Sequence, residues 1–409
     1  MKKVIVIGGG AAGLMAAYAA AKNGNQVDLI EKNEKLGKKI YITGKGRCNL
    51  TNDVAPNEFL ANVVHNSKFL TGSLYSFSPQ DMKNFMEENG THVKTERGNR
   101  VFPVSDHASD VTKALEKACK KAGVTVHLNE KVLDIGIIDS TMSDIITTKG
   151  RYFCDCAIVC TGGLSYPTTG STGDGYKFAQ KAGHTVGTLF PALTGLNLKG
   201  TNFFNMQGLS LKNVVLTAKR GEKTIYSALG EMLFTHYGIS GPLVLTLSSQ
   251  LARENVKNIS LYLDLKPALT EEKLNARILR DFEEAKNKML VNALTALLPS
   301  KMIESVLKTA EISPKKQVNA VTKEERTRLV QTLKNYPLQP ISLRGFEEAI
   351  ITSGGIDVKQ INPKTMELKN HPGIFVCGEI IDIDAYTGGY NLQLAFSTAV
   401  AAGKSAAEW

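Results

Sequence analysis

Three glycines near the start of the chain have the spacing of a dinucleotide-binding turn. Val4–Ile7 is predicted to form a buried β-strand, and Gly8, Gly10 and Gly13 follow it in the pattern G-x-G-x-x-G, before a helix of small residues. In this pattern the first glycine permits a tight turn, the second lets the backbone approach a pyrophosphate, and the third lets the helix pack closely on the strand. The unpaired N–H groups at the helix start would face the phosphates.

An acidic residue completes this unit at the end of the second predicted strand. Gln26–Ile30 leads into Glu31, eighteen residues after Gly13, and its carboxylate can accept hydrogen bonds from a ribose diol. Strand, glycines, helix, strand and acid therefore occur in the expected order. This order predicts dinucleotide binding but does not distinguish FAD from NAD.

A second set of candidate residues lies close to the C-terminus. Gly373–Glu379 is an apolar run that ends on Gly378 and Glu379, where a carboxylate could bind a ribityl or ribose hydroxyl. A helix of small residues is predicted from Asn391 to about residue 407, capped by Asn391 or by the glycines before it. The positive end of such a helix would stabilise the negative charge of a reduced flavin. We expect this C-terminal segment to return to the domain that contains the N-terminal glycine motif, which favours FAD over NAD.

Length and composition indicate a globular protein of two or three domains. The chain has 409 residues, 43% of them hydrophobic and 22% charged. No apolar run is long enough to cross a bilayer, so we expect no membrane partner. The opening apolar stretch alternates with glycines and does not resemble a signal peptide. Six cysteines in a chain of this length predict no disulfide framework and favour a reducing cytoplasm.

The net charge of +10 could indicate a nucleic-acid or membrane partner. Much of the lysine and arginine surplus lies in helical stretches such as Lys113–Lys121 and Lys266–Lys288, where acidic residues alternate with it, as on a solvated surface. A cofactor with phosphate groups and an anionic substrate would also account for positive charge. We therefore expect a small-molecule substrate rather than a nucleic acid.

Shifts in composition predict one dinucleotide-binding domain interrupted by an insertion. We place the first part of the FAD-binding domain at 1–190, an inserted β-barrel at 191–265, an inserted helical subdomain at 266–336, and the second part of the FAD-binding domain at 337–409. Short apolar runs predict strands in the barrel, among them Leu243–Leu247. In the first domain, strands around Ile135–Thr147 and Arg151–Val159 are expected to form a hairpin or meander.

Several further motifs resemble those of one bacterial flavoprotein family. They are Gly37–Asn52, which includes Thr-Gly-Lys-Gly-Arg-Cys-Asn, and the segments Gly98–Pro103, Leu233–Pro242 and Thr387–Gln393. With the opening glycines, they resemble the aminoacetone oxidase-like FAD-binding enzymes, a family that includes a proposed 3-dehydro-bile-acid reductase. The resemblance covers nearly the whole chain. It implies an α/β fold with a Rossmann-like FAD-binding domain of glutathione-reductase type, an inserted β-barrel and helical subdomain, and no separate NAD domain.

The resemblance also implies which residues contact the cofactor. Lys38 and Lys39 would lie near the pyrophosphate, Thr43–Asn49 along the isoalloxazine, Val132 at the adenine edge, and Thr161–Gly163 in a second flavin-contacting turn. The full set of expected FAD-binding residues is Gly8, Gly10, Ala11, Ala12, Gly13, Glu31, Lys32, Lys38, Lys39, Thr43, Gly44, Gly46, Arg47, Cys48, Asn49, Val132, Thr161, Gly162, Gly163, Gly378, Glu379, Gly389, Tyr390, Asn391 and Leu392.

Arg47, His236 and Tyr390 are the candidate catalytic residues. A histidine in a glycine-bounded loop could act as an acid or base near neutral pH, and a tyrosine or arginine could protonate or orient a substrate at the flavin face. Cys48 has no partner at C-x-x-C spacing, so a packing role is expected. Cys154, Cys156 and Cys160 have no histidine nearby, and we expect no metal site.

These expectations combine into an FAD-dependent oxidoreductase that transfers hydride between flavin N5 and a small or planar substrate. We favour reduction of an enone-like C=C bond, with NADH or NADPH binding transiently. Oxygen-dependent oxidation of a small amine such as aminoacetone is the alternative. A flavin-bearing RNA-modifying or RNA-binding protein is a further alternative, suggested by the charge of +10. The oligomeric state is left open.

Overall fold

The protein divides into two compact units. The structure, a computed structural model, describes residues 1–138, 141–201 and 203–408. Unit 1 comprises Met1–Ala192 and Gly345–Trp409, and unit 2 comprises Leu193–Arg344. Unit 2 is thus inserted into the sequence of unit 1. None of the helices in the described residues has the length and apolar character needed to span a bilayer.

A five-stranded parallel sheet forms the centre of unit 1. Its order is β21-β11-β1-β2-β7. Because parallel strands carry their carboxyl ends at one edge, the turns after β1, β2, β11 and β21 lie close together. The strands are β1 (Lys3–Ile7), β2 (Gln26–Ile30), β7 (Thr125–His127), β11 (Cys156–Val159) and β21 (Ile374–Val376).

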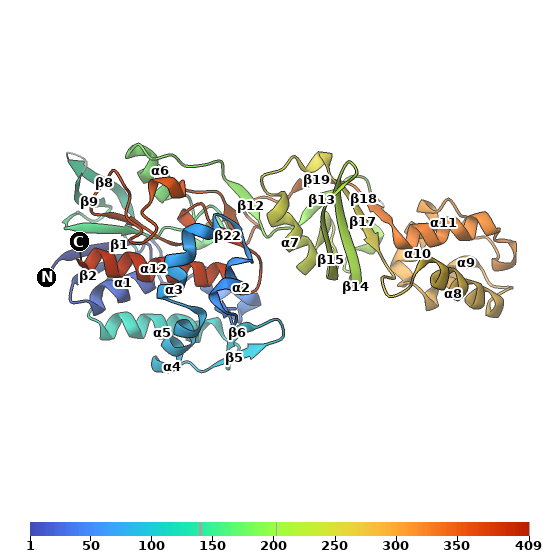
Figure 1. The fold of residues 1–409 in the computed structure, drawn as a ribbon, viewed down its shortest axis with the longest axis horizontal. Helices are drawn as coiled ribbons and strands as arrows, with labels where there is room; N and C mark the ends of the chain where they lie inside the picture. The colour runs from blue at the N-terminus through green and yellow to red at the C-terminus, as the bar shows by residue number, and fades with distance from the viewer. Residues whose placement is uncertain (139–140, 202, 409) are drawn as a thin grey trace. The chain divides into compact units, whose positions relative to one another are not determined.

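Smaller antiparallel sheets and helices surround this sheet (Figure 1). The strands are β3 (Thr51–Asn52), β4 (Val63–His65), β5 (Val93–Glu96), β6 (Arg100–Pro103), β8 (Val132–Ile138), β9 (Thr141–Thr147), β10 (Arg151–Phe153), β12 (Phe190–Ala192), β20 (Ile351–Ser353) and β22 (Asp384–Ala385). The helices are α1 (Ala11–Lys22), α2 (Pro56–Leu60), α3 (Thr71–Ser76), α4 (Pro79–Glu88), α5 (Ala108–Lys121), α6 (Asp174–Lys181) and α12 (Tyr390–Glu408).

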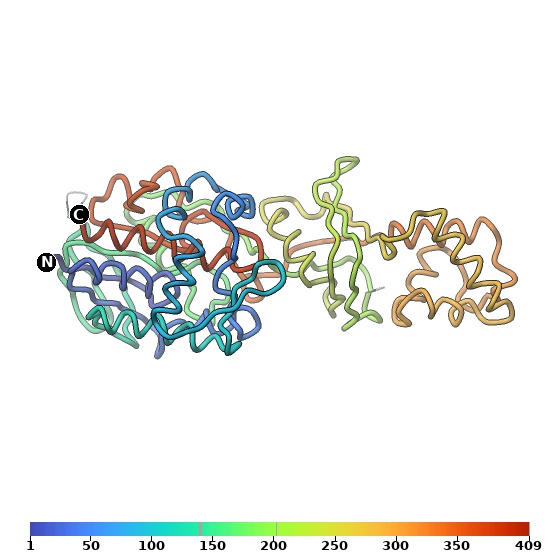
Figure 2. The backbone as a smooth tube through the Cα atoms, turned by 60° about the horizontal axis from the view of Figure 1, so that its bottom comes forward, coloured from blue at the N-terminus to red at the C-terminus, as the bar shows by residue number. Residues whose placement is uncertain are grey.

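Small side chains let the first and last helices of unit 1 pack closely. α1 and α12 lie side by side in both views (Figures 1 and 2). A Cβ added at Gly403 would lie 2.6 Å from the carbonyl oxygen of Ala16 and 2.7 Å from the Cβ of Ala19. The backbones of the two helices therefore lie in direct contact here. This contact holds the N-terminal and C-terminal segments of the chain together in unit 1.

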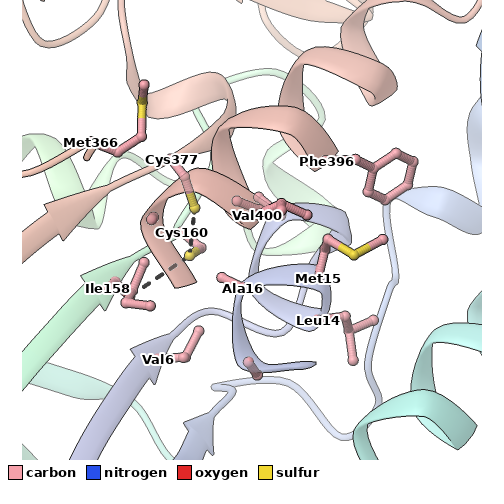
Figure 3. Close-up of a cluster of buried hydrophobic side chains, with 14 of the residues drawn as sticks. Val6, Leu14, Met15, Ala16, Ile158, Cys160, Met366, Cys377, Phe396 and Val400 are labelled. Carbon is pink, nitrogen blue, oxygen red and sulfur yellow. Dashed lines mark hydrogen bonds between the residues drawn. The ribbon is translucent and has the colours of Figure 1, made fainter. Parts of the chain in front are cut away.

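A pair of thiols lies in the core beneath these helices. Cys160 follows β11 and Cys377 follows β21, and their Sγ atoms are 3.1 Å apart (Figure 3). Met15 of α1 and Val400 of α12 belong to the same buried cluster. Burial raises the pKa of the Cys160 thiol well above its usual value. All six cysteines are free thiols.

The strands of unit 2 form a barrel. Seven antiparallel strands have the order β18-β17-β14-β15-β16-β13-β19. The two outermost strands are separated in the chain only by Gln339, so the two edges meet in one continuous segment and the sheet closes on itself. The strands are β13 (Leu196–Leu198), β14 (Ser210–Arg220), β15 (Lys223–Phe234), β16 (Gly238–Ser240), β17 (Ser260–Asp264), β18 (Tyr336–Leu338) and β19 (Pro340–Leu343).

The helices of unit 2 are α7 (Pro242–Leu251), α8 (Glu271–Glu284), α9 (Leu290–Ala293), α10 (Ser300–Thr309) and α11 (Lys323–Lys334). The strand predicted over Leu243–Leu247 is wrong, since these residues lie in α7. Gly241, at φ 96°, ends the preceding strand, and Pro242 occupies the first helical turn. A run of five apolar residues has no periodicity that separates a strand from a buried helix.

The α/β class with a Rossmann-like domain and an inserted barrel is confirmed. The strand predicted around Ile135–Thr147 is in fact two strands, β8 and β9, which pair antiparallel. The strand predicted around Arg151–Val159 is also divided: β10 pairs with β9, whereas β11 belongs to the central parallel sheet. The middle of the first predicted strand, residues 139–140, lies outside the described residues.

Candidate cofactor and active site

The glycine turn after β1 has the close approaches that its spacing predicts. A Cβ at Gly8 would lie 2.7 Å from the carbonyl oxygen of Cys160, and Gly8 adopts φ 101°. A Cβ at Gly13 would lie only 1.7 Å from the carbonyl oxygen of Gly8. A Cβ at Gly10 would meet no atom within 4 Å. Gly8 and Gly13 therefore serve packing, whereas Gly10 borders open space that a pyrophosphate could fill.

The start of α1 is available to an anion. Among the described residues no side chain caps this end, and its first turn holds no acidic residue. The N–H groups of the first helical turn have no partner within the helix, and the helix dipole adds positive potential. A Cβ at Gly378 would lie 2.8 Å from the Cβ of Ala12. The turn after β21 therefore reaches the same helix start.

Glu31 is buried and holds the glycine turn in place. Its Oε2 accepts a hydrogen bond from the N–H of Gly9 at 2.6 Å. Its Oε1 accepts from the backbone N–H of Asn33 at 2.8 Å and from Asn33 Nδ2 at 2.7 Å. The sequence interpretation missed Gly9 and Asn33, and only the run of three glycines gave a signal for Gly9. Lys32 is bound to Asp174 at 2.6 Å.

Glu379 is the centre of a polar network at the same edge of the sheet. Its Oε2 lies 2.7 Å from Lys39 Nζ, and its Oε1 accepts hydrogen bonds from Ser165 Oγ at 2.5 Å and from the N–H of Thr352 at 2.9 Å. Lys39 Nζ also donates to Ser165 Oγ at 2.6 Å. Ser165 and Thr352 carry no motif that sequence reasoning could have used.

The loop before β3 has an unusual backbone. Gly44, Lys45, Gly46 and Cys48 all adopt positive φ angles between 57° and 87°. Left-handed conformations cost energy at non-glycine residues and are concentrated at functional sites. Burial raises the pKa of the Cys48 thiol to about 12, which supports packing rather than redox chemistry for this residue. In the described part of the chain, the buried Oδ1 of Asn49 has no hydrogen-bond partner.

The first turn of α12 packs against this loop and β3. A Cβ at Gly389 would lie 2.2 Å from the carbonyl oxygen of Thr51 and 2.9 Å from Asn49 Oδ1. The backbone of Gly389 precedes the helix and accepts the N–H of Gln393, as the predicted glycine cap requires. Asn391 does not cap the helix: its side chain bonds the backbone of Ala385. Leu392 is half-buried.

The turn after β11 contributes a second unpaired polar atom. The buried Oγ1 of Thr161 has no hydrogen-bond partner among the described residues. A Cβ at Gly162 would lie 2.7 Å from Ser171 Oγ, and one at Gly163 would lie 2.4 Å from Thr352 Oγ1. Val132, expected at the adenine edge, is buried at the start of β8.

These residues fit a flavin dinucleotide. Buried polar atoms normally have partners, so the unpaired Asn49 Oδ1 and Thr161 Oγ1 are suited to hydrogen bonds from a bound group. Open space beside Gly10 and an uncapped helix start suit a pyrophosphate. The first turn of α12 contains no acidic residue, so its positive end is available to a reduced flavin. The individual FAD contacts stay predictions.

The candidate catalytic residues differ in their surroundings. Arg47 is bound by Glu96 and Asp106, which hold its pKa above the usual value, and its guanidinium lies 4.2 Å from the ring centroid of Phe102. It is therefore suited to positioning rather than to proton transfer. Lys38, expected near the pyrophosphate, forms an ion pair with Glu34 at 3.2 Å.

Tyr390 and His236 lie in different units. Tyr390 begins α12 and packs edge-on against Phe59, with ring centroids 4.9 Å apart. Burial raises the pKa of its phenol, so Tyr390 stays protonated at neutral pH. His236 is exposed in the turn between β15 and β16 of unit 2. Its catalytic role stays a prediction.

The cysteines considered for a metal have other surroundings. Cys156 Sγ lies 3.6 Å from the carbonyl oxygen of Ala406, and Cys154 Sγ lies 3.7 Å from Met142 Sδ. Within residues 1–138, 141–201 and 203–408, no three His, Cys, Asp or Glu side chains form a group able to hold a metal.

A histidine pair outside this site is expected to make the stability of unit 1 pH-dependent. His184 Nε2 and His371 Nδ1 are 2.7 Å apart, and His184 Nδ1 bonds Gln360 Oε1 at 2.9 Å. Burial, followed by the charge of His184, lowers the pKa of His371 below its unfolded value of 6.5. The unfolded chain therefore takes up the proton first, and the unfolding free energy falls as pH drops below 6.5.

Denaturant titrations between pH 8 and pH 5 would measure this loss, about 1.4 kcal/mol per unit of pKa depression. His371→Gln should flatten the pH dependence, whereas substitution of the exposed His236 should leave it unchanged. An unchanged slope in His371→Gln would contradict the assignment.

The Rossmann-like fold and the residues around Gly10, Glu31 and Gly378 fit a protein that binds FAD. The chain belongs to the HI0933-like protein Rossmann domain family, whose model matches residues 2–405. With the relatives below, this family confirms the predicted class of enzyme, an FAD-dependent oxidoreductase. This confirms the flavoprotein resemblance stated from the motifs.

Two named relatives match over almost the whole chain. The 3-dehydro-bile acid delta(4,6)-reductase of Clostridium scindens is 30% identical and the match covers 100% of both chains. The ribosomal RNA dihydrouridine synthase of Escherichia coli is 31% identical, covering 97% of this chain and 95% of the relative. A 3-ketosteroid-delta4-(5alpha)-dehydrogenase from Rhodococcus jostii has a similar fold, with a TM-score of 0.54 and 14% identity, covering 100% of this chain and 97% of that one.

Proposed function

We propose that this protein reduces a C=C bond conjugated to a carbonyl group, with NADH or NADPH as the transient electron donor. The observation that carries the proposal is the first turn of α12, a helix start without an acidic residue that packs on the loop containing Asn49. Bound FAD supplies hydride transfer at its N5 atom. The helix start would stabilise negative charge there without reorganisation of water.

Residues of unit 1, together with one candidate from the inserted unit, would bind and orient the substrate. Tyr390, kept protonated by burial, is our candidate for donating a proton to the substrate. Arg47 would hold the loop through Glu96 and Asp106. Lys39 and Glu379 would position the cofactor's polar chain. His236 of unit 2 is the second candidate acid.

The two relatives support this reaction class. One name describes reduction of a steroid whose double bonds are conjugated to a 3-oxo group, and the other describes conversion of uridine to dihydrouridine in ribosomal RNA. In uracil, too, the reduced C=C bond is conjugated to a carbonyl group. The same hydride chemistry would therefore serve both substrates. The six free thiols also support a reducing cytoplasmic location.

RNA is a second candidate substrate, and one observation favours it. Unit 1 has 27 lysine and arginine residues against 26 acidic ones, whereas unit 2 has 22 against 13. Unit 1 contains the expected FAD-binding residues, so FAD phosphates do not account for the surplus in unit 2. A polyanionic substrate would.

Anaerobic mixing tests the reaction. We expect NADH or NADPH to bleach the flavin absorbance, and a 3-oxo-4-ene steroid or uracil in RNA to restore it. Bleaching by aminoacetone, with reoxidation by oxygen, would instead establish the amine-oxidation alternative. Denatured protein should release FAD. A flavin-free preparation that also refuses added FAD would contradict the proposal.

A further inference from the structure

The inserted unit carries nearly all the net charge of the protein. Unit 2 contributes +9 of the total of +10, and unit 1 contributes +1. The charge is present on the barrel as well as on the helices: Lys199, Lys212 and Lys223 are exposed in the barrel part. Such an excess attracts a partner with many negative charges rather than a small molecule with one.

Unit 2 also contains a groove that is lined in part by aromatic residues. It is a cavity of about 310 Å³ at β17 and β18, where the barrel closes. These two strands pair antiparallel and are labelled in Figure 1. Of the aromatic residues that line it, Phe203 and Tyr336 are buried and form its floor, and Tyr262 is half-buried. Among the described residues that line it, Lys199 is the one charged side chain, and it is positive.

A second cation lies next to this groove. Lys219 Nζ is 5.4 Å from the ring centroid of Tyr262, and the strand that carries Lys219 pairs with β17. Lys199 follows β13, and its backbone N–H donates to the carbonyl oxygen of Gln339 at 2.8 Å, which fixes it beside β18. Lys199 therefore lines the groove, and Lys219 of β14 lies next to its half-buried Tyr262 ring.

Flat apolar rings and nearby cations are the features that bind single-stranded nucleic acid. Bases stack on aromatic side chains whatever their sequence, and lysines neutralise the phosphates between them. Duplex RNA hides its base faces and could not use Tyr262. A neutral steroid would use the rings but would gain nothing from the charge of +9.

We propose that unit 2 binds single-stranded RNA, with Lys199 and Lys219 on the phosphates and an unpaired base in the groove at Tyr262. This rests on the RNA branch of the proposed function. The inserted unit would then hold the nucleic acid while unit 1 holds the cofactor.

Binding of a labelled 12-nucleotide oligouridylate to the full FAD-loaded chain tests the proposal. Fluorescence anisotropy between 50 and 300 mM salt would give the affinity and its salt dependence. We expect Lys199→Gln with Lys219→Gln to weaken binding at least 10-fold and to reduce the salt slope by about 1.4, since each phosphate contact to a single strand contributes about 0.7. Tyr262→Ala should weaken binding about 10-fold, the loss of one stacked base.

The matched control is Lys120→Gln with Lys177→Gln, two exposed lysines of unit 1. It should bind RNA as the wild type does. FAD content and bleaching by NADH or NADPH should be the same in all variants, which shows that they are folded. Absence of binding at 50 mM salt, equal losses in the control, or tighter binding of a duplex of the same length would overturn the proposal.

Binding and turnover separate this inference from the proposed function. If the oligouridylate binds through Lys199, Lys219 and Tyr262 but its uracil is not reduced, the inference holds and the RNA branch of the proposed function fails. If uracil is reduced at wild-type rates by Lys199→Gln with Lys219→Gln, the inference is wrong and the proposed function stands.

Discussion

Replacing Gly13 with alanine is expected to lower the unfolding free energy of unit 1 by about 3 kcal/mol and to abolish FAD retention. The added Cβ would lie 1.7 Å from the carbonyl oxygen of Gly8, so α1 must move away from β1. Because α1 packs along α12, the displacement would also disturb the helix that begins at Tyr390. Denaturant titration and the flavin absorbance of purified protein measure the two effects.

Gly10→Ala is the matched control, because a Cβ at Gly10 meets no atom within 4 Å. This variant should keep wild-type stability in the absence of cofactor but bind FAD at least 100-fold more weakly, about 2.7 kcal/mol, because the methyl group projects toward the expected pyrophosphate. Equal FAD affinity in Gly10→Ala and wild type would show that the phosphates lie elsewhere.

Glu379→Ala is expected to destabilise the protein by about 2–3 kcal/mol and to weaken FAD binding. The substitution removes the acceptor of Ser165 Oγ and of the Thr352 N–H, and it leaves the half-buried Lys39 without its counter-charge. Thermal or denaturant unfolding measures the first effect, and titration of the apoprotein with FAD measures the second.

Glu379→Gln isolates the role of charge. The amide can still accept from Ser165 and Thr352, so most of the stability should return while the attraction to Lys39 is lost. A double-mutant cycle with Lys39→Met should give a coupling of about 1 kcal/mol or more. Additive effects in that cycle would mean that the two side chains do not stabilise one another.

Local sequence patterns predicted those parts of the candidate site that are formed by residues close together in the sequence. Gly8, Gly13 and Glu31 act within one strand–helix–strand unit, so their spacing alone indicates their geometry. Ser165 and Thr352 carry no such pattern. They meet Glu379 only because β11, β20 and β21 bring three distant segments together.

Short apolar runs were the weakest signal. Leu243–Leu247 has the composition of a strand, yet Pro242 and the buried Leu247 and Leu251 belong to a helix. Five residues are too few to show a period of 3.6 rather than 2. The closing strands of the barrel, Tyr336–Leu343, are similarly defined by their pairing with β17 and β13, not by composition.

By itself, the sequence determined the cofactor class, the α/β fold and the total charge of +10, because each depends on residue types or on spacing within a few dozen residues. Only the tertiary structure decided that Cys160 meets Cys377 and that Asn49 lies beside the start of α12. These are contacts between segments hundreds of residues apart. Chain folding creates such proximity, and no local pattern encodes it.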